Sequence, residues 1–386
     1  MNAESKLLIG ALRRAVAGTT EQLSLSVDWQ ALLRLAQMHM LLPLLYDGLR
    51  RDPGDWEQVP EGAQKVLYRA FLQAVHQDVR MEYLGQQLAE KLTEAEVPYI
   101  VLKGAVLKQN YPVPALRTMC DIDILVHTAD YPRIAAVAGA MGGKLTHSDG
   151  NHRNYSFPGG VTVEFHPNMI HHDVPVGTQI NPGWQYADPD DPHKLTEEGF
   201  YLNTICHLAN HFVAGGVGVR FVLDVWVNRH LRKPEADRTV VEAELERFGL
   251  LDFTRKIEAL AEWWFGSGDA TPLLEELGDY ILTSGSHGHT DRAILNAVSL
   301  SPGGTGTSAL LGKAFFSRAE MEDRFPWCKG RPWLLPIAWC VRAVRAVTKH
   351  GSHILTWSKG TGKVTNEQAA RQKEKLERFG IRRNKK

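Results

Sequence analysis

Apolar residues recur at helical spacing from residue 4 through residue 94, which predicts a helical N-terminal region over 1–95. Asp28 stands directly before one of these periodic segments and suits the N-cap of its helix. The Pro- and Gly-containing stretch 52–55 predicts a loop. A longer amphipathic pattern over 62–94 then predicts a long helix that packs against the following part of the chain.

The hydrophobic pattern changes between residues 96 and 167, where short apolar runs alternate with Gly- and Pro-containing turns. Predicted strands outnumber predicted helices in this stretch, so a mixed β-sheet is favoured over a doubly wound parallel one. The expected strands are 98–103, 121–127, 144–148, 152–157 and 161–166, and the expected helices are 104–110 and 130–141.

Helical periodicity returns over 196–350, after a proline-rich stretch, 168–195, that predicts a linker or surface loop. Residues 351–386 form a basic end. From residue 359 onward ten Lys/Arg stand against three Glu, so a solvated tail or frayed helix is expected, with a phosphate-contacting arm as the alternative. These patterns predict an α+β fold, in which a small mixed sheet is flanked by N-terminal and C-terminal helical regions. The helices expected in the C-terminal region begin at 196 and cover 220–231, 238–248, 251–266, 272–283, 291–299 and 333–348.

Composition narrows the cellular setting. Lys+Arg and Asp+Glu both number 44, so the net charge indicates no particular class of partner. The four cysteines are far apart and form no C-x-x-C pair, which fits a reducing compartment and no structural zinc. No run of about 18 apolar residues is present, and the first residues lack the apolar core of a signal peptide. We therefore expect a cytoplasmic protein without a membrane span.

Two carboxylates stand out in the predicted strand 121–127. Side chains alternate along a strand, so Asp121 and Asp123 share one face while Ile122 and Ile124 point into a core. Two adjacent acids repel each other, and a divalent cation held by their oxygens relieves that repulsion. If repulsion dominates, replacing Asp123 with Asn leaves the stability equal or higher.

A third acid repeats this pattern later in the chain. Glu164 interrupts the apolar run 161–166, so carboxylates from neighbouring strands are placed to hold one or two Mg²⁺ ions, with Mn²⁺ as the alternative, against a triphosphate. The bland interpretation, surface acids on an edge strand, fits the apolar flanks poorly, because unpaired carboxylates in a buried strand are costly.

A glycine after one strand, Asp-x-Asp on the next and a third acid on a later strand resemble the nucleotidyltransferase superfamily of the DNA polymerase β type. The longer string resembles the bacterial family of uncharacterised nucleotidyltransferases. Two positions differ from that pattern, since Ala105 follows the glycine and Cys120 precedes the first Asp, but neither is a metal ligand. The residues that carry the resemblance are Leu102, Lys103, Gly104, Tyr111, Pro112, Arg117, Met119, Asp121, Ile122, Asp123, Leu125, Val126, Val163, Glu164, Phe165 and His166, with weaker matches at Asp28, Trp29, Ala36, His39, 42–45, His207, His211, Arg220 and Asp224.

The resemblance implies an enzyme that moves a nucleoside monophosphate from an NTP, ATP by default, to a hydroxyl acceptor and releases pyrophosphate. Asp121, Asp123 and Glu164 are the expected metal ligands and catalytic residues. A second group is expected to bind the nucleotide. It consists of Lys103, Gly104 and Arg117 at the phosphates and of His207 and His211 at the nucleotide or acceptor pocket.

The sequence leaves several alternatives open. The same residues suit a non-catalytic nucleotide- and metal-binding regulatory module, or a phosphotransferase that acts at the γ-phosphate. The acceptor is expected to be a small molecule or a protein or peptide rather than nucleic acid, because residues 97–167 carry no basic stripe. Two further residue assignments are structural: His39 as a hydrogen-bonded buried histidine, and Arg220 with Asp224 as an i,i+4 ion pair.

Overall fold

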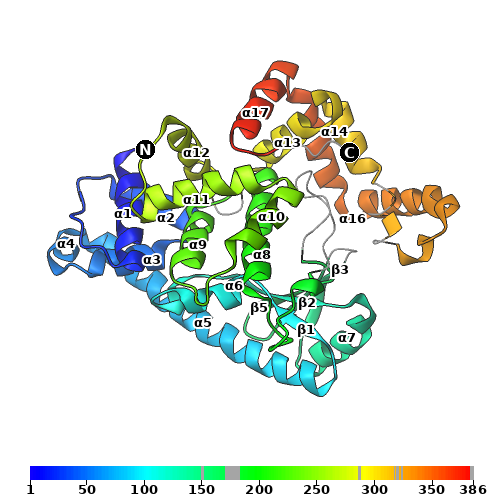
Figure 1. Ribbon diagram of the computed structural model, residues 1–386, viewed down its shortest axis with the longest axis horizontal. Helices are drawn as coiled ribbons and strands as arrows, with labels where there is room; N and C mark the ends of the chain where they lie inside the picture. Colours follow the sequence, from blue (N-terminus) through cyan, green and yellow to red (C-terminus); the bar gives the residue numbers. More distant parts are fainter. Residues whose placement is uncertain are drawn as a thin grey trace.

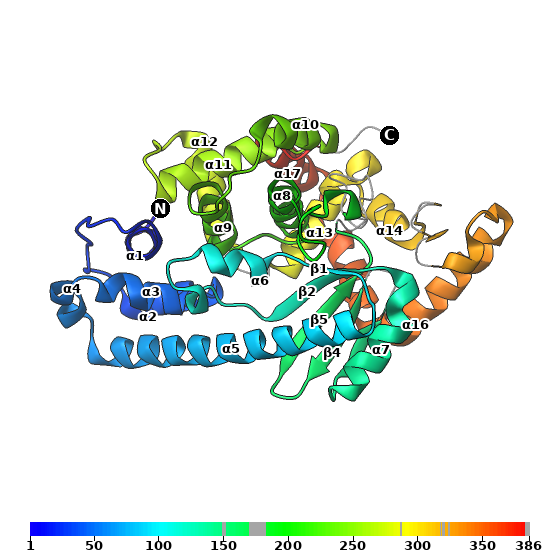
Figure 2. The same cartoon turned by 60° about the horizontal axis from the view of Figure 1, so that its bottom comes forward.

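The computed structural model describes residues 1–148, 152–169, 183–285, 288–316, 318, 321–322 and 325–382. Helices dominate, and a small sheet lies between the long helix α5 (Glu61–Glu94) and the helices of the C-terminal region (Figure 1; Figure 2). This arrangement confirms the predicted α+β class. None of the helices in the described part of the chain has the length and apolar run that a membrane crossing needs.

Four shorter helices precede α5. They are α1 (Ala3–Ala17), α2 (Trp29–Met38), α3 (Leu42–Arg50) and α4 (Pro53–Gln58). Asp28 caps α2 as predicted, because its carboxylate accepts from the backbone N–H groups of Gln30 and Ala31. The loop predicted at 52–55 is wrong. Asp52 caps the short helix α4 and Pro53 occupies its first turn, where a proline has no N–H to leave unsatisfied.

The described residues contain a five-stranded mixed sheet in the order β1-β2-β5-β4-β3. β2 and β5 pair in parallel, and the other neighbours are antiparallel. Gly159 and Gly160 turn the chain from β4 into β5, both at positive φ, which glycine adopts without strain. The strands are β1 (Tyr99–Val101), β2 (Asp121–Val126), β3 (Lys144–Ser148), β4 (Arg153–Phe157) and β5 (Val161–His166).

The two faces of this sheet differ in chemistry. Alternate residues such as Ile122, Ile124 and Val163 form one hydrophobic cluster with α5 and with α7 (Tyr131–Ala140). The opposite face carries the acidic positions, and Leu125 on that face belongs to the cluster that joins both helical regions. The sheet therefore buries its apolar face against α5 and α7 and turns its polar face towards the C-terminal helices. A short helix, α6 (Gly104–Leu107), follows β1.

The C-terminal region is helical, as predicted. Thr196 caps its first helix. The helices are α8 (Glu197–Val213), α9 (Val219–His230), α10 (Arg238–Phe248), α11 (Leu251–Phe265), α12 (Pro272–Leu282), α13 (Thr290–Leu300), α14 (Gly306–Ala314), α16 (Leu335–Lys363) and α17 (Asn366–Arg378). Of the predicted loop 168–195, residues 170–182 lie outside the described residues. His193 in the described remainder stacks on Tyr99 of β1 with ring centroids 4.1 Å apart.

The solvated tail predicted from residue 359 onward is wrong. α16 continues to Lys363, and α17 begins at a capping box formed by Thr365 and Gln368. Leu376, Phe379 and Ile381 are fully buried in the core cluster that also contains α1 and α11. The basic residues of α17 occupy its outer side, so its high charge hides an amphipathic helix.

His39 joins the two helical regions. Its side chain is fully buried, its Nδ1 accepts from the backbone N–H of Val219 at 3.2 Å, and its Nε2 donates to the carbonyl of Leu282 at 3.1 Å. The first of these bonds satisfies an N–H group in the first turn of α9, whose N-cap is Gly218. Burial lowers the pKa of His39 to about 4, outweighing the Leu282 bond, which raises it.

Because His39 is buried in its neutral form, we expect the free energy of unfolding to fall in acid. Its pKa is depressed from 6.5 to about 4, so the unfolded chain binds the extra proton between those values and stability falls as pH drops from about 6.5 to about 4. The loss is about 3 kcal/mol at most. His39→Gln should be less stable at pH 7 but should lose less on acidification. Urea unfolding of both proteins across this range measures the difference, and parallel curves would contradict the assignment.

Candidate functional site

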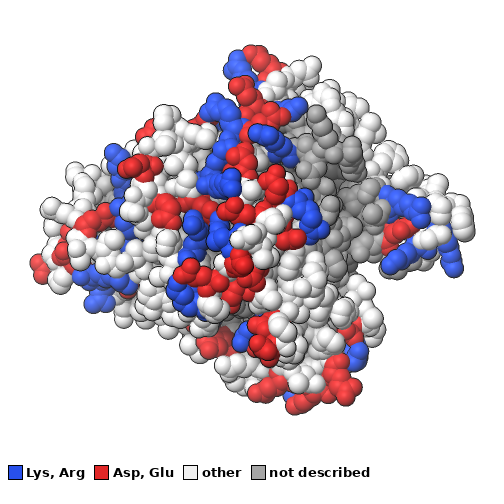
Figure 3. All heavy atoms as spheres, viewed as in Figure 1, with Lys and Arg blue, Asp and Glu red and all other residues white. Residues whose placement is uncertain are grey.

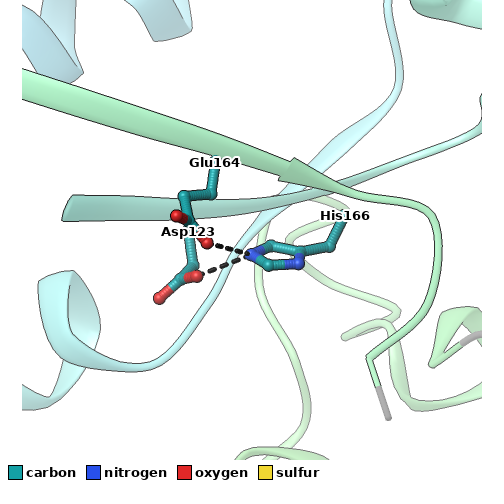
Figure 4. Close-up of side chains that lie close together, drawn as sticks. All are labelled: Asp123, Glu164 and His166. Atoms are coloured by element: carbon teal, nitrogen blue, oxygen red, sulfur yellow. Dashed lines mark hydrogen bonds and ion pairs between the residues drawn. The ribbon is translucent and has the colours of Figure 1, made fainter. Parts of the chain in front are cut away.

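Three side chains converge on the polar face of the sheet. Asp123 of β2 and Glu164 and His166 of β5 each offer a ligand atom within 4.8 Å of the others. His166 Nε2 lies 2.6 Å from Asp123 Oδ1 and 3.5 Å from Glu164 Oε2 (Figure 4). Asp123 and His166 are buried, and Glu164 is half-buried. Two carboxylates and an imidazole so arranged form a candidate site for a divalent cation.

The parallel pairing of β2 with β5 produces this cluster. Asp123 is directly opposite Glu164, and Leu125 is opposite His166. Residues two apart on a strand share a face, so His166 lies on the same side as Glu164. On the far side of β5, Asn154 of β4 is opposite Glu164, and its amide donates to Glu164 Oε1 at 2.5 Å. One Glu164 oxygen is thereby held by Asn154 while the other faces His166.

Asp123 remains ionised although it is buried. Burial alone would raise its pKa, but Lys103 and the hydrogen bond from His166 hold the pKa of that carboxyl well below its usual range. Lys103 Nζ lies 3.1 Å from Asp123 Oδ1, the oxygen that also faces His166. The positive charge of Lys103 thus occupies the position beside Asp123 that a cation needs. The expectation that Asp123→Asn relieves repulsion is therefore reversed.

Asp121 has the opposite electrostatic situation. Burial, followed by the charges of Asp123 and Glu164, raises the pKa of Asp121 to about 6, although Lys103 and Arg220 oppose that rise. Its carboxylate interacts with the cluster but is not among the ligand atoms within 4.8 Å of one another in the described residues. Carboxylate repulsion, predicted for the pair, is thus concentrated on Asp121.

Lys103 and Gly104 form the turn between β1 and α6. Lys103 has φ 48° and ψ −120°, a conformation that costs a non-glycine residue free energy and that clusters at functional sites. A Cβ on Gly104 would lie 2.6 Å from an Arg117 nitrogen and 2.8 Å from the Met119 sulfur. Packing therefore gives a reason for glycine here that is independent of phosphate binding.

Arg117 has a buried partner on α9. Its Nε and Nη2 donate to the two carboxylate oxygens of Asp224 at 2.8 and 2.7 Å, and the Tyr111 hydroxyl donates to the same carboxylate at 2.7 Å. The predicted Arg220–Asp224 pair is wrong, because Asp224 pairs with Arg117. Arg220 instead donates to the carbonyl of Thr118. This geometry gives Arg117 a structural role, and its role in nucleotide binding stays a prediction.

His207 and His211 lie together on α8. Their ring centroids are 4.4 Å apart, and both rings pack against Phe221 of α9 at 5.6 and 5.5 Å. His207 is close enough to Asp123 to help lower the pKa of that carboxyl, after the larger effects of burial, Lys103 and His166. The C-terminal helical region thus contributes an aromatic group to the surroundings of the acidic cluster.

His166 and Asn154 are site residues that the sequence analysis did not assign. His166 had a detectable signal, since it follows Glu164 by two positions and therefore shares its face. Asn154 could be assigned to the site only once the register of the β4–β5 hairpin was known. Arg220, whose charge acts on Asp121, could be assigned only once the position of α9 was known. Both assignments depend on strand pairing and helix packing rather than on local pattern.

Comparison with known protein families gives a match that covers this site. A family model described as an uncharacterised nucleotidyltransferase matches residues 26–266. That range is more than half of the chain and contains the whole sheet together with α8 and α9. The chain belongs to this family. No curated protein and no solved structure matches it.

Membership makes the protein a nucleotidyltransferase, an enzyme whose class takes a nucleoside triphosphate as substrate. The acidic cluster of this nucleotidyltransferase lies within the matched range. Its donor set, two carboxylates and an imidazole, is compatible with the divalent metals that such enzymes commonly use.

The two aspartates should respond oppositely to substitution in metal-free protein. The pKa of Asp121 is raised from 3.8 to about 6, so the free energy of unfolding falls as pH rises from about 3.8 to about 6 and stays low above that. Asp121→Asn should raise the free energy of unfolding by about 1–2 kcal/mol at pH 8 and change it much less at about pH 4. Asp123→Asn should lower it by about 1–3 kcal/mol, because Lys103 and His166 lose their ionised partner.

Denaturant unfolding of both variants in metal-free buffer at about pH 4 and pH 8 measures these changes. Glu57→Gln, at an exposed acid outside the cluster, is the matched control and should resemble wild type at both pH values. Equal stabilisation by Asp121→Asn and Asp123→Asn would mean that mutual repulsion, rather than Lys103 and His166, dominates the site.

Proposed function

We propose that the protein transfers a nucleoside monophosphate, AMP by default, from an NTP to a hydroxyl group of an acceptor and releases pyrophosphate. The observation that carries the proposal is the placement of Asp123 directly opposite Glu164 on parallel neighbouring strands. His166 completes that group, and Lys103 Nζ lies 3.1 Å from Asp123 Oδ1. Family membership supports nucleotidyl transfer in general. The roles of the individual residues are part of our proposal.

The residues present suit a divalent cation. Asp123 and Glu164 supply the oxygen ligands that Mg²⁺ prefers, and His166 adds a nitrogen ligand that Mn²⁺ accepts readily. Asp121 is two residues from Asp123 on the same face and is positioned to contribute a further oxygen. Such a cation, when bound, neutralises charge on the triphosphate and stabilises the attacking and leaving oxygens.

The side chains around this cluster have separable tasks. Lys103, which balances Asp123 here, is placed to pair with the triphosphate and then with the leaving pyrophosphate. Glu164 accepts the proton of the acceptor hydroxyl, and Asn154 holds its other oxygen in a fixed orientation. Because Gly104 has no side chain, the turn that carries Lys103 is able to approach the phosphates closely. Arg220, whose charge reaches Asp121, is a further candidate for contact with phosphate.

The acceptor pocket is assigned to the side of the cluster that faces the C-terminal helices. His207, His211 and Phe221 provide aromatic surface there for a base or an acceptor. Positive and negative side chains are intermixed on the face of the molecule shown in Figure 3, without the basic stripe that a long nucleic acid would need. A small molecule or a protein or peptide is therefore the proposed acceptor.

Labelled ATP tests this proposal and separates it from attack at the γ-phosphate. With Mg²⁺ and fractionated cell extract, α-labelled ATP should label an acceptor while γ-labelled ATP yields labelled pyrophosphate. Transfer of the γ-label to the acceptor would instead identify a phosphotransferase. Labelling of RNA in place of small molecules or protein would overturn the assigned acceptor class. If neither label is transferred or released, the protein is a nucleotide-binding module that does not catalyse transfer.

Removal of either central carboxylate should abolish this transfer. Asp123→Asn and Glu164→Gln should each reduce the rate at least about 100-fold, because the metal loses a ligand or the acceptor loses its base. Glu57→Gln is the matched exposed control and should keep full activity. Circular dichroism and Mn²⁺ binding measured by electron paramagnetic resonance distinguish loss of fold or metal from loss of chemistry. A fully active Asp123→Asn protein would refute the site.

A further inference from the structure

An exposed apolar stripe runs along the outer side of α5. Its members recur at spacings of four, three, four and four residues, which keeps them on one side of a helix. Four are strongly exposed: Tyr68 at 50%, Leu72 at 48%, Val79 at 62% and Tyr83 at 67%. Val75, between them, is half-buried. We call these five residues the α5 stripe.

The stripe lies apart from the face by which α5 packs on its own chain, except that the centroid of the Tyr68 ring lies 5.9 Å from that of the Tyr46 ring of α3. That packing face is formed by residues such as Leu67, Ala74, Met81 and Leu88, which lie roughly opposite the stripe at 100° per residue. Figures 1 and 2 show α5 along the lower edge of the molecule, with the sheet and the N-terminal helices on its inner side. Contiguous exposed apolar surface of this kind marks an interaction site.

The charges beside the stripe change sign along α5. Over 61–77 the basic Lys65 and Arg69 outnumber the acidic Glu61, whereas over 78–94 four acids outnumber two bases: Asp78, Glu82, Glu90 and Glu94 against Arg80 and Lys91. Lys65 has a partner within the helix, Glu61 at 2.5 Å, but both side chains are more than 70% exposed. A surface with this gradient complements an identical surface that runs in the opposite direction. It suits a membrane or a nucleic acid poorly, since either would meet the acidic half with repulsion.

We propose that the α5 stripe binds the α5 stripe of a second copy of this chain in an antiparallel, two-fold symmetric pair. With the symmetry axis near residue 77, Val75 meets Val79 of the partner subunit and Leu72 meets Tyr83 of the partner subunit. The same register sets Lys65 against Glu90 of the partner subunit. An isologous interface repeats each contact twice, so the apolar layers and the Lys65–Glu90 pairs agree on one register, which also brings Glu61 near Glu94 of the partner subunit.

The mass of the full-length protein tests this pairing. Light scattering after size exclusion should give twice the 43.1 kDa mass of the chain for wild type. Val79→Glu, at the centre of the stripe, should give a monomer. Val240→Glu is the matched control, since Val240 on α10 is 46% exposed and lies outside the stripe, and it should remain a dimer. Val79 is a surface residue, so its substitution leaves the core intact, which circular dichroism checks. Tyr83→Lys is a second variant that tests the same stripe.

A charge exchange tests the direction of the pair. Lys65→Glu should raise the dimer dissociation constant about tenfold, because both symmetric contacts become repulsive. Adding Glu90→Lys should restore the wild-type constant in an antiparallel pair. Failure of this rescue would overturn the antiparallel register.

A wild-type monomer at every concentration up to about 100 μM, the weak end of specific association, would overturn the proposal. So would a Val79→Glu protein that remains as dimeric as Val240→Glu, because the interface would then lie elsewhere. None of these variants alters the acidic cluster, so their outcome is independent of the proposed transfer reaction.

Discussion

The parallel pairing of β2 with β5 is the constraint on which the functional site depends. It sets Asp123 against Glu164 and leaves Asp121 on the same face, so three acids share a partly buried region. Lys103 and His166 keep Asp123 ionised there, whereas the pKa of Asp121 is raised by burial and by its neighbours. The fold tolerates this concentration of charge because the opposite face of the same strands is packed against α5 and α7.

A second set of contacts holds the sheet and the helical regions in one arrangement. Arg117 and Tyr111 bind Asp224 of α9, and His39 satisfies the backbone of Val219 at the start of that helix. Buried ion pairs contribute little net stability, but breaking one leaves a charge without a partner, so such pairs restrict which packing is accepted. Here they orient α9, which brings the charge of Arg220 close to Asp121.

Local pattern predicted much of the fold. The alternation of Asp121 and Asp123 with isoleucines, the apolar run around Glu164 and the Gly- and Pro-containing turns were enough to predict the strands and a mixed sheet. The cap at Asp28 and the period of α5 were also readable. The many charges of α17 predict a solvated segment, but the helix buries Leu376 within a stretch rich in Lys and Arg. At 52–55, Asp and Pro predict a loop, but the same residues also suit the first turn of a helix, which is what forms.

The sequence by itself therefore determined most of the secondary structure, the polar and apolar faces of the strands and the residue types available for a metal and a triphosphate. These properties follow from backbone periodicity, which acts over a few residues. Tertiary structure alone decided which residues meet. It paired Arg117 with Asp224, placed Lys103 beside Asp123 and brought Asn154 to Glu164. Such choices depend on strand register and on helix packing between segments as far as 107 residues apart, which no local pattern encodes.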